Sequence, residues 1–176
     1  INAYLCDEIY EHFKNSGKEY PLQIVGLHID MITTLIQLNE KKKVFNYLHT
    51  IKEIYQDNFG EKSYLFCRNW CYILNEIMLE ILPEVAMEEF EENRELFSTI
   101  LKEEGILYTL CMNIALKRTN QEQKVIYIKE AIELCEIWCK NVSTELQKEI
   151  QRLVHGISAM YYRNIGEYDI AIKTFY

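Results

Sequence analysis

Two pairs of cysteines lie four residues apart in this sequence, at Cys67/Cys71 and Cys135/Cys139. Four residues is about one helical turn, so the thiols of each pair share a helix face. A zinc site would need further ligands, commonly at CxxC or HxxxH spacing. The four histidines are instead scattered, at His12, His28, His49 and His155. We interpret the pairs as reduced core cysteines and predict no metal and no cofactor.

A run of glutamates is the second group that could do chemistry. Paired carboxylates serve as general acids and bases, but nothing in the sequence pairs with this run, and it lies opposite the apolar stripe of its segment. We interpret it as a solvated helix face. A Gly-rich phosphate loop, a nucleophile elbow and HExxH are absent from the sequence, so we expect no enzyme activity in these residues. The run comprises Glu88, Glu89, Glu91, Glu92 and Glu95.

Aromatic side chains form the third group, with thirteen tyrosines among them. Most lie at core spacing, and packing is the ordinary use of a buried aromatic. Five of them could also line a binding groove, and this alternative to packing stays open. They are Trp70, Tyr72, Tyr108, Trp138 and Tyr161.

Composition and charge narrow the class of protein. The 176 residues suit one domain, and 49% apolar content with two prolines and six glycines is typical of a packed helical chain. The net charge is −8, and the only basic run is Lys41-Lys42-Lys43. Because nucleic-acid binding needs clustered positive charge, we expect none through this segment.

The cysteine pattern and the hydropathy predict a cytoplasmic protein without membrane association. All six cysteines, Cys6 and Cys111 included, fall in apolar helical patterns rather than in a disulfide scaffold. We see no signal peptide and no apolar run approaching about 18 residues. The chain starts at Ile1 and stops within a helix at Tyr176, so we expect it to be part of a longer protein that holds the effector function.

Apolar residues at intervals of three and four predict nine helices. Breaks are expected at Ser16-Gly17 and Thr119-Asn120, Pro21 is expected to open a helix and Pro83 to stop one, and Ser143 is a predicted N-cap. The predicted helices are residues 2–15, 21–38, the segment between the turns at 39–41 and 58–60, 62–81, 84–103, 106–117, 121–140, 143–165 and from 169 onwards.

The last segment carries a recognisable set of positions. It resembles a tetratricopeptide repeat, in which a small residue and a Tyr occupy the first helix, Gly-x-Tyr the turn, and Ala with an aromatic the second helix. The resemblance implies that Ala171 lets the returning helix come close and that Phe175 fills the gap between the two helices. The matching residues are Ala159, Tyr162, Gly166, Tyr168, Ala171 and Phe175.

Comparable small or β-branched positions occur upstream of Ala171 at spacings of 40 to 45 residues, at Ala131, Ala86, Val44 and Ala3. This spacing exceeds the 34 residues of a strict repeat, and only the last unit carries the consensus turn. We therefore predict an all-α fold: a tetratricopeptide-like α-solenoid of about nine helices in antiparallel pairs, forming a single domain over residues 1–176.

The resemblance also implies a binding face. In tetratricopeptide domains the first helix of each pair lines a concave channel that holds a peptide. Asparagine suits this task because a carboxamide can pair with both N–H and C=O of a peptide, and arginine because a guanidinium binds carboxylates. The matching candidates are Arg68, Asn75, Asn113, Arg163 and Asn164. The alternative for each is a solvated helix surface.

These features are similar to those of the repeat domains in peptide-sensing bacterial regulators of the Rap, Rgg, PlcR and PrgX class. The resemblance implies quorum sensing: an imported peptide binds the repeats, shifts the population between two curvatures or dimeric states, and so changes transcription or signalling. A homodimer is one expected assembly. The alternative is a constitutive scaffold or adaptor for protein–protein interaction.

Overall fold

The computed structural model describes residues 3–15, 23–118 and 120–175, and all regular structure in these ranges is helical. Because α4, η1 and α5 follow one another without a break, these ranges hold nine helical segments. This confirms the predicted all-α fold. The elements are α1 (Ala3–Asn15), α2 (Gln23–Gln37), α3 (Lys41–Phe59), α4 (Tyr64–Ile73), the π-helix η1 (Leu74–Met78), α5 (Leu79–Ile81), α6 (Pro83–Ile100), α7 (Gly105–Lys117), α8 (Gln121–Lys140), α9 (Thr144–Asn164) and α10 (Tyr168–Phe175).

Most predicted boundaries agree with the structure to within a few residues. Pro83 is the first residue of α6, a position where its missing N–H costs nothing. The predicted helix over 62–81 contains the π-helical turn η1, which the sequence pattern did not indicate. The predicted features at Ser16-Gly17, Pro21 and Thr119 lie outside the described residues, as does the side chain of Cys6.

The predicted N-cap is at the right position but does not cap through its side chain. Ser143 occupies the N-cap position of α9, but its hydroxyl makes no capping hydrogen bond. The turn is held from the other side, where the Gln147 amide donates to the Val142 carbonyl at 3.1 Å. A side-chain cap is found on α8, where Asn120 Oδ1 accepts from the Gln123 backbone N–H at 3.1 Å.

The chain divides into two compact units, Ile1–Ile73 and Leu74–Tyr176. In the first unit α2 packs against α3, and α3 against α4. The fully buried His28 stacks on Tyr55 with ring centroids 5.8 Å apart. Burial lowers the pKa of His28 to about 4 because a charged imidazolium is disfavoured away from water. The single domain over 1–176 stays a prediction.

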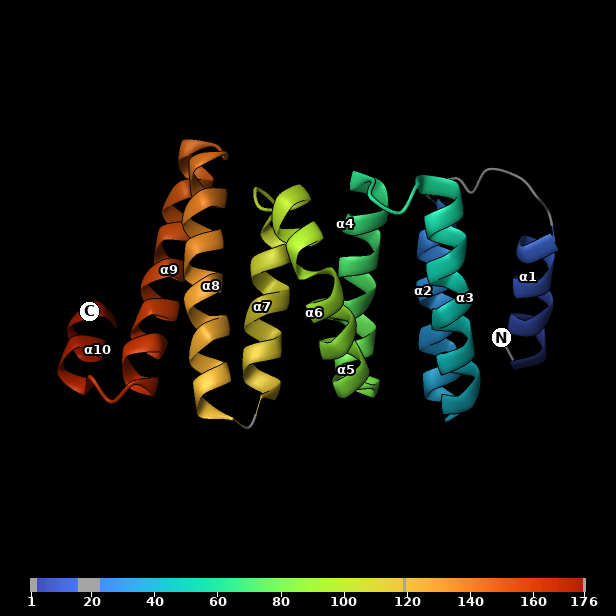
Figure 1. The fold of residues 1–176 in the computed structure, drawn as a ribbon, viewed down its shortest axis with the longest axis horizontal. Coiled ribbons are helices and arrows are strands. Elements are labelled where there is room, and N and C mark those ends of the chain that lie inside the picture. The colour runs from blue at the N-terminus through green and yellow to red at the C-terminus, as the bar shows by residue number, and fades with distance from the viewer. Residues whose placement is uncertain (1–2, 16–22, 119, 176) are drawn as a thin grey trace. The chain divides into compact units, whose positions relative to one another are not determined.

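In the second unit, helices α7 to α10 pack in chain order, each against the next. Figure 1 shows them side by side with their connections at alternating ends, so neighbouring helices run antiparallel. Helix α6 and the η1–α5 segment pack with α7. Phe90 and Phe97, both fully buried on α6, have ring centroids 6.2 Å apart. In this row the last helix, α10, packs against α9.

The positions that carried the repeat prediction are mostly buried. Val44, Ala86, Ala131 and Ala171 all lie in the core, as a close helix approach requires. The role predicted for Phe175 is wrong, because its side chain is 68% exposed instead of filling the gap between the last two helices. The regular solenoid stays a prediction.

Two other large apolar residues of the helices are exposed as well. Phe45 on α3 is 50% exposed while its neighbour Tyr47 is buried, and Tyr64 at the start of α4 is also exposed. An apolar position that fits a periodic pattern is buried only where a neighbouring helix covers it.

Candidate binding site

The structure brings two of the predicted binding residues together. The Asn113 amide on α7 donates to Asn75 Oδ1 in η1 at 2.8 Å, and the Asn75 amide donates to Glu76 at 2.6 Å. Asn75 is buried. The two carboxamides thus hold η1 to α7. This role is structural, because buried polar groups need hydrogen-bond partners. Arg68 is exposed on α4, in the first unit.

A third asparagine also has protein partners. The Asn164 amide donates to the Met160 carbonyl at 2.7 Å, and Gln121 Nε2 donates to Asn164 Oδ1 at 2.9 Å and to its carbonyl at 2.8 Å. Asn164 therefore ties the end of α9 to the start of α8. The peptide-binding role of the three asparagines and of Arg68 stays a prediction.

Arg163, the remaining predicted residue, lies in a groove between α9 and α10. The turn before α10 contains Gly166 at φ +86°, a backbone conformation that glycine adopts readily. The Glu167 N–H donates back to the Tyr162 carbonyl at 2.9 Å and closes the turn. Helix α10 then returns along α9, with the small residues Ala159 and Ala171 both buried on the two facing helices.

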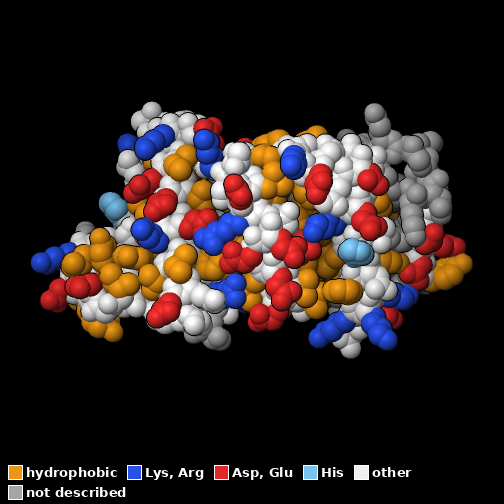
Figure 2. All heavy atoms as spheres, viewed as in Figure 1, with side chains coloured by type: hydrophobic (Ala, Val, Ile, Leu, Met, Phe, Trp, Pro, Cys, Tyr) orange, Lys and Arg blue, Asp and Glu red, His pale blue; other side chains and the backbone are white. Residues whose placement is uncertain are grey.

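The groove has a volume of about 460 Å³ and is mostly apolar. Its walls include Tyr168, Ile172 and Phe175, which are 64%, 59% and 68% exposed. Figure 2 shows hydrophobic side chains gathered over this C-terminal end of the second unit. Contiguous exposed apolar surface of this kind is typical of an interaction site. The lining residues are Gly156, Ala159, Met160, Arg163, Tyr168, Ala171, Ile172 and Phe175.

Among the described lining residues, Arg163 is the one that carries a charge, and it is exposed to solvent. Its guanidinium forms no salt bridge or hydrogen bond with any group in the described part of the chain. Other arginines of the unit are paired: Arg152 with Glu149 at 2.7 Å, and Arg94 with Glu130. A lone guanidinium among apolar side chains can bind a carboxylate that arrives on another molecule.

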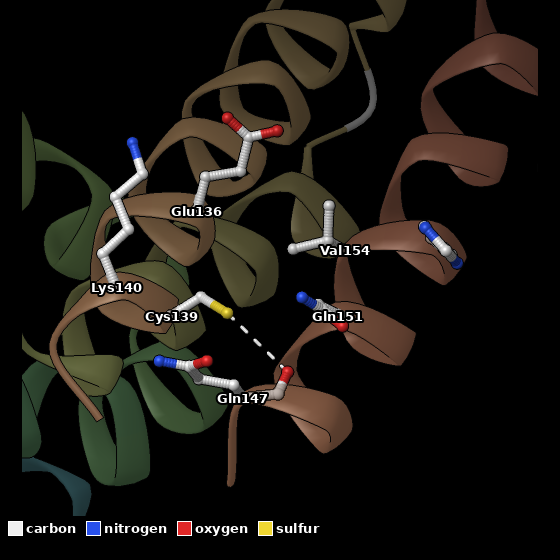
Figure 3. Close-up of a pocket in the computed structure, with 7 residues that line it drawn as sticks. Glu136, Cys139, Lys140, Gln147, Gln151 and Val154 are labelled. Carbon is white, nitrogen blue, oxygen red and sulfur yellow. Dashed lines mark hydrogen bonds between the residues drawn. The ribbon is translucent and has the colours of Figure 1, made fainter. Parts of the chain in front are cut away.

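A second cavity, of about 340 Å³, lies on the opposite flank of α9, against the end of α8. Figure 3 shows Cys139 pointing from α8 towards α9, where its thiol contacts the Gln147 carbonyl at 3.7 Å. Cys139 is half-buried, unlike the fully buried thiol expected from the sequence. Burial, with Cys139 and Glu136 nearby, raises the pKa of Cys135 to about 11 and keeps that thiol protonated.

The cysteines give no further indication of a site. The five whose side chains are described are free thiols, and four of them are buried. Within the described residues no group of three or more His, Cys, Asp or Glu side chains is arranged to hold a metal.

A charged network between α6, α7 and α8 was not predicted. Tyr127 is buried, and the guanidinium groups of Arg94 and Arg118 lie over its ring at 5.2 and 5.6 Å from the centroid. Its hydroxyl donates to Glu91, and Arg94 also binds Glu130. Burial opposes the charge on Arg94, but Glu130 and Glu91 outweigh it and raise the pKa of the guanidinium. The partners are about 36 residues apart, so helical periodicity cannot reveal them.

The five aromatic residues that could either pack in the core or line a groove have different environments in the structure. Trp70 is buried and belongs to the core, whereas Tyr72 is exposed. Tyr108 and Trp138 stack with centroids 5.6 Å apart, and Trp138 also packs over Gly105. None of the five lines the α9–α10 groove.

Comparison of the chain with protein-family profiles, with curated proteins and with solved structures finds no match. The tetratricopeptide resemblance therefore rests on the residues of the last segment alone. In the described part of the chain, every helix is too short or too polar to cross a membrane.

Proposed function

We propose that this chain is an interaction domain that binds a peptide or protein segment in the groove between α9 and α10. The observation that carries the proposal is that Arg163, which has no carboxylate partner in the described part of the chain, lines the groove together with the exposed side chains of Tyr168, Ile172 and Phe175. Covering that apolar surface supplies affinity. The guanidinium supplies selectivity, and tyrosine and arginine are among the residues enriched where binding energy concentrates at interfaces.

A pair of isoleucines on α10 allows a matched test of the groove. Ile172 lines the groove, whereas Ile170 is similarly solvent-accessible, at 42%, but is not part of the lining. Since neither side chain is buried, Ile172→Asp and Ile170→Asp should leave the fold intact. Fluorescence anisotropy with a panel of labelled apolar peptides would measure binding to both variants and to the unchanged chain.

We expect Ile172→Asp to weaken binding by about tenfold or more, since it places a charge in an apolar contact, and Ile170→Asp to leave binding unchanged. Equal loss in both variants, or binding that neither variant alters, would place the contact elsewhere. No binding by any peptide in the panel would overturn the proposed function.

We further propose that the chain is a sensor, in which binding of the peptide changes the state of the protein. A cytoplasmic peptide-sensing regulator would transmit occupancy of the groove by shifting the equilibrium between two states of the chain. Hydrogen exchange with and without a bound peptide separates it from a scaffold. Altered protection in helices away from α9 and α10 would support the sensor, and protection confined to those two helices would support a constitutive adaptor.

A further inference from the structure

The proposed function leaves the form of the bound segment open, and the groove itself narrows it. Resting on that function, we infer that the groove receives an amphipathic α-helix of a partner protein, and that this helix presents a carboxylate to Arg163. Three properties of the groove lead to this occupant: the spacing of its lining residues, the state of its backbone and its single charge.

The spacing of the lining residues is the same on both walls. On α9 the lining positions are Gly156, Ala159, Met160 and Arg163, and on α10 they are Tyr168, Ala171, Ile172 and Phe175. Each set follows the i, i+3, i+4, i+7 pattern that one helix face presents to another. Seven residues of helix extend about 10 Å, so the two walls form a seat for about two turns of a third helix.

Small residues lie in both walls. Ala159 and Ala171 are buried between the helices, and a Cβ built on Gly156 meets no atom within 4 Å. Small side chains let another helix approach closely while Met160, Ile172 and Phe175 project beside it. This relief matches the knobs and grooves of helix packing.

The backbone of the groove disfavours an extended occupant. Both walls are helical, and within a helix the N–H groups beyond the first turn and the C=O groups before the last turn are already paired. Among the described lining residues, only Arg163 and Tyr168 have polar side chains. An extended peptide would lose its hydrogen bonds to water here and find few replacements. A helix satisfies its backbone internally, which makes it the favoured occupant.

The carboxamides that would suit an extended peptide are already engaged by the protein. Asn113 is bonded to Asn75, and Asn164 to Met160 and Gln121. None of the three lines the groove.

The charge of the groove selects the chemistry of the helix. Covering Arg163 with an apolar surface would remove water from a guanidinium that has no partner in the described part of the chain. Leaving a charged donor buried and unpaired is costly. The bound helix must therefore bring an acceptor, and a Glu or Asp carboxylate matches the guanidinium in both charge and geometry.

The test uses a panel of labelled synthetic helices on the full chain. Each is an acetylated and amidated peptide of about 18 residues, or five turns, with leucine at i, i+3, i+4 and i+7 and one glutamate moved in turn through the flanking positions. Each has two matched forms, one with Gln in place of Glu and one with a central Pro-Gly that breaks the helix. Anisotropy gives the affinity of every form.

We expect one glutamate position to bind most tightly, with its Gln form about tenfold weaker and its Pro-Gly form at least as weak. Arg163→Gln in the protein should remove the advantage of Glu over Gln. Arg152→Gln is the matched control on the same helix, because the Arg152 side chain is 76% exposed and pairs only with Glu149 in the described part of the chain.

Each contrary outcome overturns a different statement. Equal binding of the Pro-Gly and helical forms would reject the helical occupant while leaving the proposed peptide-binding function intact. A helix that binds equally with Glu and Gln would reject the carboxylate. Absence of binding by every form of the peptide would reject both the helical occupant and its carboxylate. Dimerisation of the chain that Ile172→Asp abolishes and Ile170→Asp does not would identify a second copy as the occupant and overturn the partner helix.

Discussion

The second unit contains two sites that combine arginine with aromatic side chains, and they differ in whether a carboxylate of the described chain pairs with the arginine. Around Tyr127, Arg94 and Arg118 lie over the ring and pair with Glu91 and Glu130. In the α9–α10 groove, Arg163 lies among Tyr168 and Phe175 without a carboxylate from the described chain. The first arrangement has its carboxylates within the protein, whereas we propose that a carboxylate of a bound partner completes the second.

The largest expected difference between the two sites is in the cost of removing an aromatic ring. Tyr127→Ala deletes a buried ring that contacts Phe90 and two guanidinium groups, and we expect the free energy of unfolding to fall by about 3–4 kcal/mol. Phe175→Ala removes an exposed ring and should change it by less than about 0.5 kcal/mol. Urea denaturation measures both. Similar losses would show that the groove aromatics stabilise the fold.

A buried titratable group that lacks a counter-charge should be neutral in the folded protein. His28 in the first unit allows a test of this through the pH dependence of stability. His28 has a folded-state pKa of about 4 against an ordinary value of 6.5. Between these values the unfolded chain binds a proton that the folded chain does not, so stability falls as the pH falls. The full loss is about 3 kcal/mol by pH 4, and above pH 6.5 there is none.

Unfolding free energies measured across this range check the prediction. His28→Gln should flatten the dependence, while His49→Gln, which alters an exposed histidine near Glu53, should not. A profile that His28→Gln leaves unchanged would show that other groups cause the acid sensitivity.

Removing one arginine from each site gives the next contrast. Arg94→Gln leaves the mostly buried Glu130 without its cation, and we expect a loss of about 2 kcal/mol in unfolding free energy. Arg163→Gln should cost almost nothing in stability, because the described protein gives that guanidinium no partner to lose. Thermal unfolding in parallel would test this. A destabilised Arg163→Gln variant would break the comparison.

The smallest effect is expected at a glycine in the groove. Gly156 lies inside α9, and an added methyl meets nothing within 4 Å, so Gly156→Ala should stabilise the helix by about 0.5–1 kcal/mol. The methyl also takes space from the groove, so helix binding should weaken. Gly105→Ala is the contrast, since its Cβ would lie 2.8 Å from Trp138 and should destabilise. Tighter binding by Gly156→Ala would place the occupant away from α9.

Local signals in the sequence were sufficient for the helices and for one turn of the site. Periodic apolar residues predicted the nine helical segments, and Gly166 predicted the turn that brings α10 back onto α9. Ala171 was correctly expected at the helix contact. Each of these depends on residues close together in the chain, which sequence spacing can reveal.

Features that depend on distant residues were not predictable. The π-helix η1, the Asn75–Asn113 pair and the network around Tyr127 all require knowing which helices are neighbours. Phe175 shows the same limit, because it has a core-like spacing in the sequence and is nevertheless 68% exposed. Arg163 was named from the repeat resemblance, but its apolar surroundings became visible only in the structure.

The most direct measurement is a double-mutant cycle between Arg163 and the glutamate of the tightest-binding synthetic helix. Affinities are needed for the unchanged chain and Arg163→Gln, each with the Glu and Gln forms of the peptide. We predict a coupling energy of about 1–2 kcal/mol, because the guanidinium and the carboxylate meet only in the complex. A coupling below about 0.3 kcal/mol, within the usual limit of additivity, would contradict the account of a groove completed by a partner's carboxylate.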